Sequence, residues 1–517
     1  MQKLCLVLLA FIFIGQGCNS SNQRENSSFD NLSNDAHSYA NFNEARTTHL
    51  NLDLTVDFEQ KVLSGKATWD IDKTKKAKEL ILDIGNLKIK EITLDSNIAT
   101  QYTIGPVDSI KGQALTISLQ PNTTSVTIHY STSPQAKALQ WLTPAQTLGK
   151  VHPFLFSQSQ AILARTWVPC QDAPGVKFTY EATIKTDSNL LALMSAENDT
   201  VLSPNGIYHF KMDQPISSYL LALTVGDLKF ASTGRNSGIY AEPAMLDRAV
   251  WELESMQSMI DSAEALYGPY GWGRYDVVIL PPSFPFGGME NPRLTFATPT
   301  IIAGDRSLVA LIAHELAHSW SGNLVTNETW NDFWLNEGFT VYFEQRIMEK
   351  IFGVPYAQML TKLGMGDLEE TIESLTSEGK IKDTHLFLNL DNQDPDDGLT
   401  DVAYEKGRFF LQTIESVVGR TRFDAFLKKY FSENKFKPMN TERFIAYLNQ
   451  NLLTDEQEKA DVKAAEWIYG PGIPDNAPEV NSAELDRVEL AIAKFNNNRI
   501  KAKDIDITGY TTHHWLY

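Results

Sequence analysis

The first half of the chain alternates between apolar and polar residues. Runs such as HLNLDLTVDFE, ALTISLQ, SVTIHYS and KFTYEATIKT fall within residues 46–230, and Gly, Pro, Asn and Asp separate them. A period of two with β-branched and aromatic residues is typical of half-buried strands. We therefore predict an N-terminal antiparallel β domain over residues 46–230.

From about residue 246 the apolar positions recur every three or four residues instead. One helix face of MLDRAVWELESMQSMIDSAEALYG carries apolar side chains at Leu246, Val250, Leu253, Met256 and Ile260. A strand, YDVVILPPS, follows, and the pattern predicts helices over most of residues 305–470. Strands and helices are thus segregated along the chain, which predicts a multidomain α+β fold with a mostly helical second domain over residues 231–470.

The last part of the chain is short and is set apart by a linker. Pro and Gly concentrate in residues 471–478, which is typical of a linker. Residues 479–517 contain the helical stretch SAELDRVELAIAKFNN and end on an apolar sequence, THHWLY. We interpret them as the beginning of a C-terminal helical domain that is truncated here.

The N-terminus has the pattern of an export signal. Residues 1–17 contain one lysine and an apolar run over residues 4–14, too short to span a bilayer, and GQGC ends at Cys18. The pattern resembles a bacterial lipoprotein signal, with lipidation at Cys18 and a polar tether over residues 18–45. An ordinary cleaved signal is the alternative. We predict an exported protein of a bacterial cell envelope that contacts the membrane only through its lipid anchor.

Composition argues against one class of binding partner and against a disulfide-stabilised fold. The 517 residues include 64 acidic and 45 basic ones, a net charge of −19, which argues against a nucleic-acid partner. Three cysteines, of which only Cys170 lies in the body of the chain, cannot form a disulfide framework.

A pair of histidines points to a metal. His314 and His318 lie four residues apart in SLVALIAHELAHSW, whose apolar spacing predicts a helix with Ser307 as N-cap and Gly322 at its end. Two imidazoles at this spacing share one helix face and form half of a tetrahedral zinc site, with Glu315 beside them. A solvent-facing polar stripe is the alternative.

An acidic residue completes the predicted site. Glu337 lies in WLNEGFTVYFE, a second predicted helix that follows His318 by 19 residues. A carboxylate among so many apolar side chains is costly unless a cation compensates it. We therefore predict one Zn²⁺ per chain, held by His314, His318 and Glu337, with the fourth position left for water.

These motifs resemble the gluzincin metallopeptidases, the zinc aminopeptidase family of aminopeptidase N and leukotriene A(4) hydrolase. SQSQAI, VPCQDAPGVKFTY, LPPSFPFGGMENP, SWSGNLVTN and AYEKG are similar to the leukotriene A(4) hydrolase branch, and the resemblance covers roughly residues 46–475. It implies a saddle-like N-terminal β domain, a thermolysin-like, mostly α catalytic domain and a C-terminal α-helical domain.

The resemblance also implies residue roles. Glu315 would act as general base towards a zinc-activated water, and Tyr404 in AYEKG would donate a hydrogen bond to the developing oxyanion. Glu290 in GGMEN would bind the α-amine of the substrate. Further substrate contacts are expected from Gln160, Gly287, Gly288, Met289 and Asp396.

The leading hypothesis is a monomeric zinc aminopeptidase that releases the N-terminal residue of short peptides with a free N-terminus. Epoxide hydrolysis on the same zinc is an alternative, because Asp396 matches an aspartate that the related branch links to that activity. Leu399 and Phe286 stand where that branch has tyrosines, which argues against it. A catalytically silent peptide-binding lipoprotein is the third hypothesis.

Overall fold

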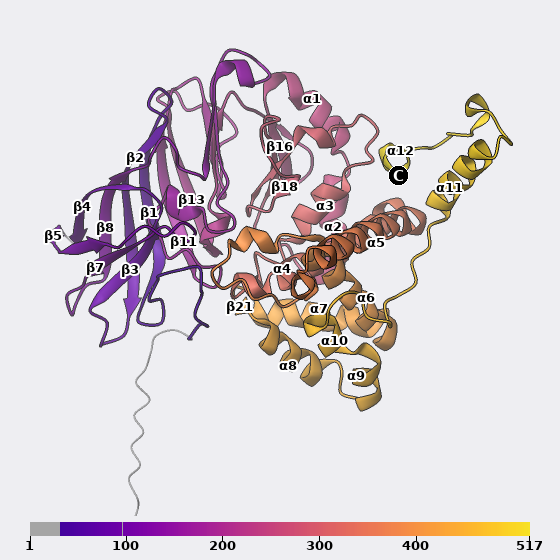
Figure 1. Cartoon of the computed structure of the whole chain (residues 1–517). Coiled ribbons are helices and arrows are strands. Elements are labelled where there is room, and N and C mark those ends of the chain that lie inside the picture. The colour runs from indigo at the N-terminus through magenta and orange to yellow at the C-terminus, as the bar shows by residue number, and fades with distance from the viewer. Residues whose placement is uncertain (1–30, 96) are drawn as a thin grey trace, which may run out of the picture.

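The structure is a computed structural model that describes residues 31–95 and 97–517. Figure 1 shows a β-rich part at the N-terminal side, a central part with its own sheet, a block of helices, and an extended C-terminal segment. The chain therefore has the predicted multidomain α+β fold. The predicted signal peptide, Cys18 and the first part of the tether lie outside the described residues.

The largest sheet has seven strands in the order β13-β11-β1-β2-β8-β4-β5. Their bounds are β1 (Ala45–Asp57), β2 (Val62–Lys73), β4 (Lys88–Leu94), β5 (Ile98–Ala99), β8 (Ser125–Ser131), β11 (Lys177–Lys185) and β13 (Ile207–Ser217). One pairing differs from the antiparallel expectation, because β1 and β11 run parallel with Leu50 opposite Tyr180. The chain passes through other sheets between these two strands, and such a long crossover allows the parallel direction.

Two smaller sheets complete the β-rich part. One joins β3 (Glu79–Ile84), β7 (Gln113–Ser118) and β6 (Tyr102–Ile104), and the other joins β12 (Leu191–Met194), β14 (Leu223–Gly226), β10 (Phe154–Ser157) and β9 (Leu139–Leu142). A buried ion pair stabilises the segment that joins β10 to β11, since Arg165 Nε lies 2.8 Å from Asp172 Oδ2. Cys170 is buried next to it and carries a free thiol.

The central part contains a five-stranded sheet in the order β15-β16-β17-β19-β18. The strands are β15 (Lys229–Ser232), β16 (Ser237–Ala241), β17 (Tyr275–Ile279), β18 (Gly288–Met289) and β19 (Leu294–Ala297). Two helices contact this sheet, α1 (Pro243–Glu252) and α3 (Ala310–Ala317), and two more, α2 (Met256–Tyr267) and α4 (Trp334–Phe352), pack against α3 and each other. The predicted strand YDVVI is β17, every residue of which is buried, and the helical period after residue 246 corresponds to α1 and α2.

The helical block consists of α5 to α10. Their bounds are α5 (Val354–Ser377), α6 (Gly407–Val418), α7 (Arg420–Asn434), α8 (Thr441–Asn451), α9 (Glu456–Val462) and α10 (Ala464–Tyr469). A short parallel pair, β20 (Thr326–Asn327) and β21 (Pro438–Met439), joins the block to the central part. Aromatic rings on α4, α7 and α8 pack together around Phe339, which contacts Tyr430 and Phe444.

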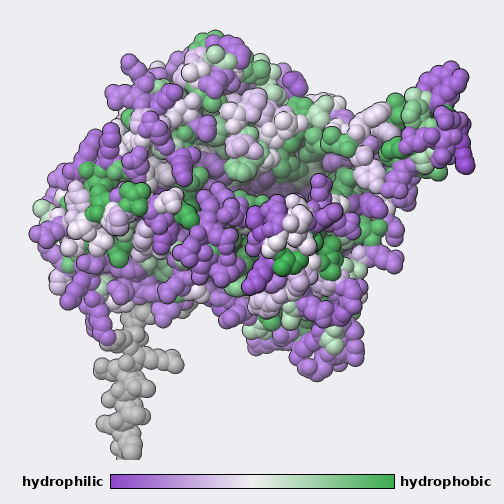
Figure 2. All heavy atoms as spheres, viewed as in Figure 1, coloured by the Kyte–Doolittle hydropathy of each residue, from purple (hydrophilic) through white to green (hydrophobic). Residues whose placement is uncertain are grey.

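The C-terminal segment leaves the block as an arm and then turns back (Figures 1 and 2). It contains α11 (Ala483–Asn496), as predicted, and α12 (Thr512–Leu516). Its end contacts the central part, because Thr512 Oγ1 donates to Asp305 Oδ2 at 3.0 Å and His513 Nε2 lies 3.0 Å from the carbonyl oxygen of Ser307. The predicted domain boundaries stay predictions. Within the described ranges, no helix has both the length and the apolarity that crossing a bilayer requires.

Candidate zinc centre

The HELAH sequence forms the end of α3, which is shorter than predicted at both ends. Ser307 is not its N-cap, because the Ser307 hydroxyl donates to Asp305 Oδ1 at 2.6 Å and a turn precedes the helix. The helix ends at Ala317 with His318 as C-cap, well before Gly322. Local turn hydrogen bonds compete with the helix at both ends, which residue spacing alone does not predict.

The three predicted zinc ligands converge on one point. His314 Nε2 and His318 Nε2 lie 3.2 Å apart, and they lie 3.3 and 3.4 Å from Glu337 Oε2. Ligand atoms about 2.0–2.1 Å from a tetrahedral zinc ion are about 3.3–3.4 Å from one another. The triangle therefore has the size that zinc requires, and α3 and α4 supply all of its corners.

The carboxylate and the two imidazoles of the triad shift one another's pKa values. Burial alone would raise the pKa of Glu337, but His318 and His314 lower it to about 2. Burial lowers the pKa of His318, yet Glu337 and Glu290 together outweigh it and raise the value to about 8. The pKa of His314 is raised as well, by Glu337 and Glu344. Because imidazole binds zinc in its neutral form, zinc binding here competes with protonation of the two histidines.

Two side chains of α4 that we did not predict orient the imidazoles. Glu344 Oε2 lies 3.1 Å from Nδ1 of His314, and Thr340 Oγ1 lies 3.1 Å from Nδ1 of His318. Thr340 follows Glu337 by three residues and Glu344 follows it by seven, so all three lie on one helix face. This spacing could have identified both residues from the sequence. Such partners fix ring orientation and increase the basicity of the ligands.

Glu315 lies beside the triad against strand β18. A Cβ atom on Gly288 would lie 2.1 Å from Glu315 Oε1, so only glycine leaves room for this carboxylate. We had interpreted Gly288 as space for the substrate backbone, and its close approach to Glu315 is a different reason for the same residue. Burial raises the pKa of Glu315 to about 8, although His314 and His318 oppose the shift.

A cleft of about 510 Å³ opens over the triad. The predicted site residues that line it are Gln160, Gly287, Gly288, Glu290, His314, Glu315, His318, Glu337 and Tyr404. Phe286, Leu399, Glu344 and His513 line it too. His513 comes from the C-terminal arm, whose return to the cleft has no local signal in the sequence.

Two predicted contacts do not line this cleft. Met289 is buried, and its sulfur accepts a hydrogen bond from Gln158 Nε2 at 3.2 Å. Asp396 lies in the short helix η7 (Pro395–Gly398), where its carboxylate interacts with the backbone of Ala161 rather than with the cleft.

Tyr404 and Glu290 both line the cleft beside the triad. Tyr404 lies in the helical turn η8 (Val402–Lys406), and its ring stacks against His314 with centroids 6.1 Å apart. Burial and the carboxylates of Glu337 and Glu290 raise the pKa of the Tyr404 phenol, which keeps its proton. Oε1 of Glu290 is buried and accepts no hydrogen bond from a described residue. This oxygen is available to a ligand.

A glycine pair sets the position of Tyr404 relative to Glu337. A Cβ on Gly338 of α4 would lie 2.7 Å from Cα of Gly407, and a Cβ on Gly407 would lie 2.8 Å from Cα of Gly338. The two backbones are thus in direct contact. One glycine follows the ligand Glu337 and the other begins α6, three residues after Tyr404.

Comparisons with known sequences agree along most of the chain. Residues 46–220 match the Peptidase M1 N-terminal domain, and residues 251–467 match the Peptidase family M1 domain. Leucine aminopeptidase 2 of Yarrowia lipolytica is 39% identical over 91% of this chain and 74% of its own length. Leukotriene A-4 hydrolase of Xenopus laevis is 41% identical over 92% of this chain and 79% of its own length.

Solved structures give the same result. Native leukotriene A(4) hydrolase from Saccharomyces cerevisiae superimposes with a TM-score of 0.87 at 36% identity, over 94% of this chain and 78% of that one. An M1 zinc metallopeptidase from Deinococcus radiodurans has a TM-score of 0.69 at 19% identity, over 86% of this chain and 100% of that one, which is a likeness of fold alone.

The predicted location in a bacterial cell envelope is wrong. Four curated relatives that align with more than nine-tenths of this chain are proteins of fungi and a frog. A short apolar run before a cysteine occurs in too many contexts to identify an exported lipoprotein.

We expect Glu344→Gln to weaken zinc binding by about 10–100-fold, because the neutral amide no longer holds the His314 ring as a carboxylate does. The measurement is a zinc dissociation constant from chelator competition. Glu349→Gln, on the same helix but paired with Arg420, is the matched control and should bind zinc like the unchanged chain. Equal affinities for both variants would contradict the role of Glu344.

We expect Gly288→Ala to lower kcat by about 100-fold while zinc content and Tm stay near those of the unchanged chain. The new methyl group displaces the flexible end of Glu315 rather than backbone, and a shift of about 1 Å in a reacting group costs about this much. Gly366→Ala, with no atom within 4 Å of the added Cβ, is the control. Unchanged kcat in Gly288→Ala would show that the carboxylate position is not critical.

Proposed function

The chain belongs to peptidase family M1 and is a zinc metallopeptidase, and we propose that it removes the N-terminal residue of short peptides that have a free α-amino group. The observation that carries this proposal is the buried, unpartnered Oε1 of Glu290 next to the metal ligands. The monomeric state stays a prediction.

The position of Glu290 explains why one residue would be removed at a time. Ligand atoms of Glu290, Glu315 and His318 lie within 4.8 Å of one another. In an α-amino acid the amine nitrogen and the carbonyl carbon are about 2.5 Å apart. A substrate whose ammonium group binds Glu290 therefore presents its first peptide bond, and no later one, to Glu315.

The residues around the peptide bond to be cleaved have separate roles in its hydrolysis. Zinc, when bound by His314, His318 and Glu337, supplies a Lewis acid that activates water and polarises a carbonyl. Glu315 accepts the proton of the attacking water and delivers it to the leaving amine. Tyr404, which keeps its proton at neutral pH, donates a hydrogen bond to the oxygen on which negative charge develops.

The geometry favours peptides over an epoxide as the substrate. Asp396, the residue that suggested epoxide hydrolysis, does not line the cleft, and Leu399 offers no polar group there. Glu290 has a clear use with an amine and none with a neutral lipid epoxide. A catalytically silent binder is disfavoured as well, because ligands, base, proton donor and amine site are all retained around one cleft.

We expect the enzyme to hydrolyse amino-acid p-nitroanilides and to leave their N-acetyl derivatives intact, because acetylation removes the charge that Glu290 binds. Glu290→Gln should reduce this preference by about 10–100-fold, since a charge-assisted hydrogen bond contributes about 1.5–3 kcal/mol. Initial rates with both substrates measure the ratio. Comparable hydrolysis of the blocked substrate by the unchanged enzyme would identify an endopeptidase instead.

We expect Glu315→Gln to lower kcat by about 10²–10⁴-fold and Tyr404→Phe by about 10²–10³-fold, with zinc content unchanged in both. The reason is that each variant removes a proton-transfer or hydrogen-bonding group without removing a ligand. Metal analysis and steady-state kinetics on the same preparation separate the two effects. Tyr469→Phe, an exposed tyrosine, is the control, and activity in Glu315→Gln equal to that control would remove Glu315 as the base.

A further inference from the structure

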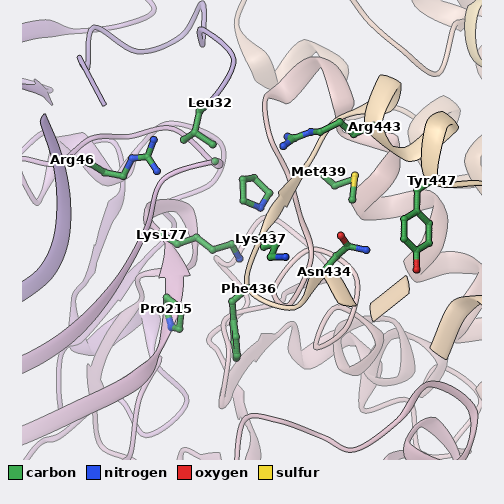
Figure 3. A pocket seen from close by; sticks show the side chains of 12 residues that line it. Leu32, Arg46, Lys177, Pro215, Asn434, Phe436, Lys437, Met439, Arg443 and Tyr447 are labelled. Atoms are coloured by element: carbon green, nitrogen blue, oxygen red, sulfur yellow. The ribbon is translucent and has the colours of Figure 1, made fainter. Parts of the chain in front are cut away.

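A second cavity of about 460 Å³ lies at the boundary between the β-rich part and the helical block (Figure 3). It shares no lining residue with the zinc cleft. Its walls are Leu32, Arg46, Gly175, Lys177, Pro215, Asn434, Phe436, Lys437, Pro438, Met439, Arg443 and Tyr447. Strands β1 and β11 supply one side, and the segment around β21 with α8 supplies the other.

The lining of this cavity is rich in basic side chains, whereas the chain as a whole is acidic. Four lining residues are cationic, Arg46, Lys177, Lys437 and Arg443, and no aspartate or glutamate is among the lining residues. The chain as a whole has a net charge of −19. Basic side chains grouped around one concave space favour anions there, although Arg443 is already paired with Glu328.

Lys177 is the most unusual of the four. It is half-buried, and its Nζ donates to the carbonyl oxygen of Asn323 at 2.8 Å. No carboxylate lies within 4.0 Å of it in the described part of the chain. Burial lowers the pKa of Lys177 to about 7. Lys185, at the other end of β11, is by contrast paired with a carboxylate, because its Nζ lies 2.9 Å from Asp53 Oδ1.

Lys437 and Arg443 also have N–H donors beyond those used by their described partners. Lys437 is exposed, and its Nζ contacts only the carbonyl oxygen of Glu433, at 3.3 Å. Arg443 forms one ion pair, with Nη2 2.7 Å from Glu328 Oε2, and its guanidinium has further N–H groups. Figure 3 shows the Lys177 and Lys437 side chains extending into the space between the two walls.

We propose that this cavity binds a small organic oxyanion, whose phosphate or carboxylate groups contact Lys177 and Lys437. The cationic groups provide charge-assisted hydrogen bonds to such oxygens. Leu32, Pro215, Phe436 and Met439 provide apolar walls, and the space is larger than one inorganic ion needs. The ligand is therefore a compact molecule with an anionic group rather than a bare ion.

Hydrogen bonds through Asn323 connect this cavity with residues of the zinc cleft. Lys177 Nζ donates to the carbonyl oxygen of Asn323, and Nδ2 of Asn323 donates to the carbonyl oxygen of Glu290 at 2.8 Å. The backbone N–H of Asn323 donates to the carbonyl oxygen of His318 at 3.0 Å. One residue thus connects the basic cavity with the amine-binding carboxylate and a zinc ligand.

Isothermal titration calorimetry of the full zinc-loaded chain tests the proposal, with citrate as the carboxylate probe and inorganic pyrophosphate as the phosphate probe. Sodium chloride keeps the ionic strength constant. We expect at least one probe to bind, and Lys177→Met/Lys437→Met to weaken its Kd by more than about tenfold, because two charge-assisted hydrogen bonds are lost. The preferred probe distinguishes a carboxylate ligand from a phosphate ligand.

Lys90→Met, which removes an exposed lysine of β4, is the matched control and should bind the probe like the unchanged chain. If the double variant does not fold, the exposed Lys437→Glu decides, since charge reversal there should also abolish binding. The proposal is overturned if neither probe binds at constant ionic strength, or if the Lys437→Glu or double variant binds as tightly as the Lys90→Met control.

Discussion

The catalytic half of the molecule depends on bringing one carboxylate and two imidazoles to a common point inside a nearly dry interior. Glu337 is only 2% exposed, and an isolated charge at that depth would be very costly. A divalent cation between the three ligands removes this cost. The rest of the arrangement then follows: α4 is buried along most of its length, and its next two turns supply Thr340 and Glu344 to orient the histidines.

Three buried carboxylates lie within one cleft and are kept distinct by their surroundings. Glu337 lies between two imidazoles, which lower its pKa to about 2, so it stays anionic and suits a cation. Burial raises the pKa of Glu315 to about 8 and also raises that of Glu290, so neither carboxylate is stabilised as an anion in the way that Glu337 is. Different environments thus suit one residue type to separate tasks, which we propose to be those of ligand, base and amine receptor.

The metal ligands could be predicted because their signal is local. HELAH fixes two imidazoles on a helix face by spacing alone, and Glu337 stands out as an acidic residue in an apolar helix. Glu290, Tyr404 and Gln160 required the family resemblance, since nothing in their own neighbourhoods identifies them. His513, the exclusion of Asp396 from the cleft and the parallel pairing of β1 with β11 depend on how distant segments meet. The spacing of residues along the chain does not predict such tertiary contacts.

The backbone contact between Gly338 and Gly407 has a consequence for how this scaffold can diversify. Both positions already lack a side chain, so a bulkier residue at one cannot be offset by a smaller one at the other. The spacing of α4 and η8, and with it the distance between the Glu337 carboxylate and the Tyr404 phenol, is therefore fixed by backbone contact in this chain. New substrate preferences would have to arise at the rim, at positions such as Phe286 and Leu399, where a change of shape leaves the helix spacing intact.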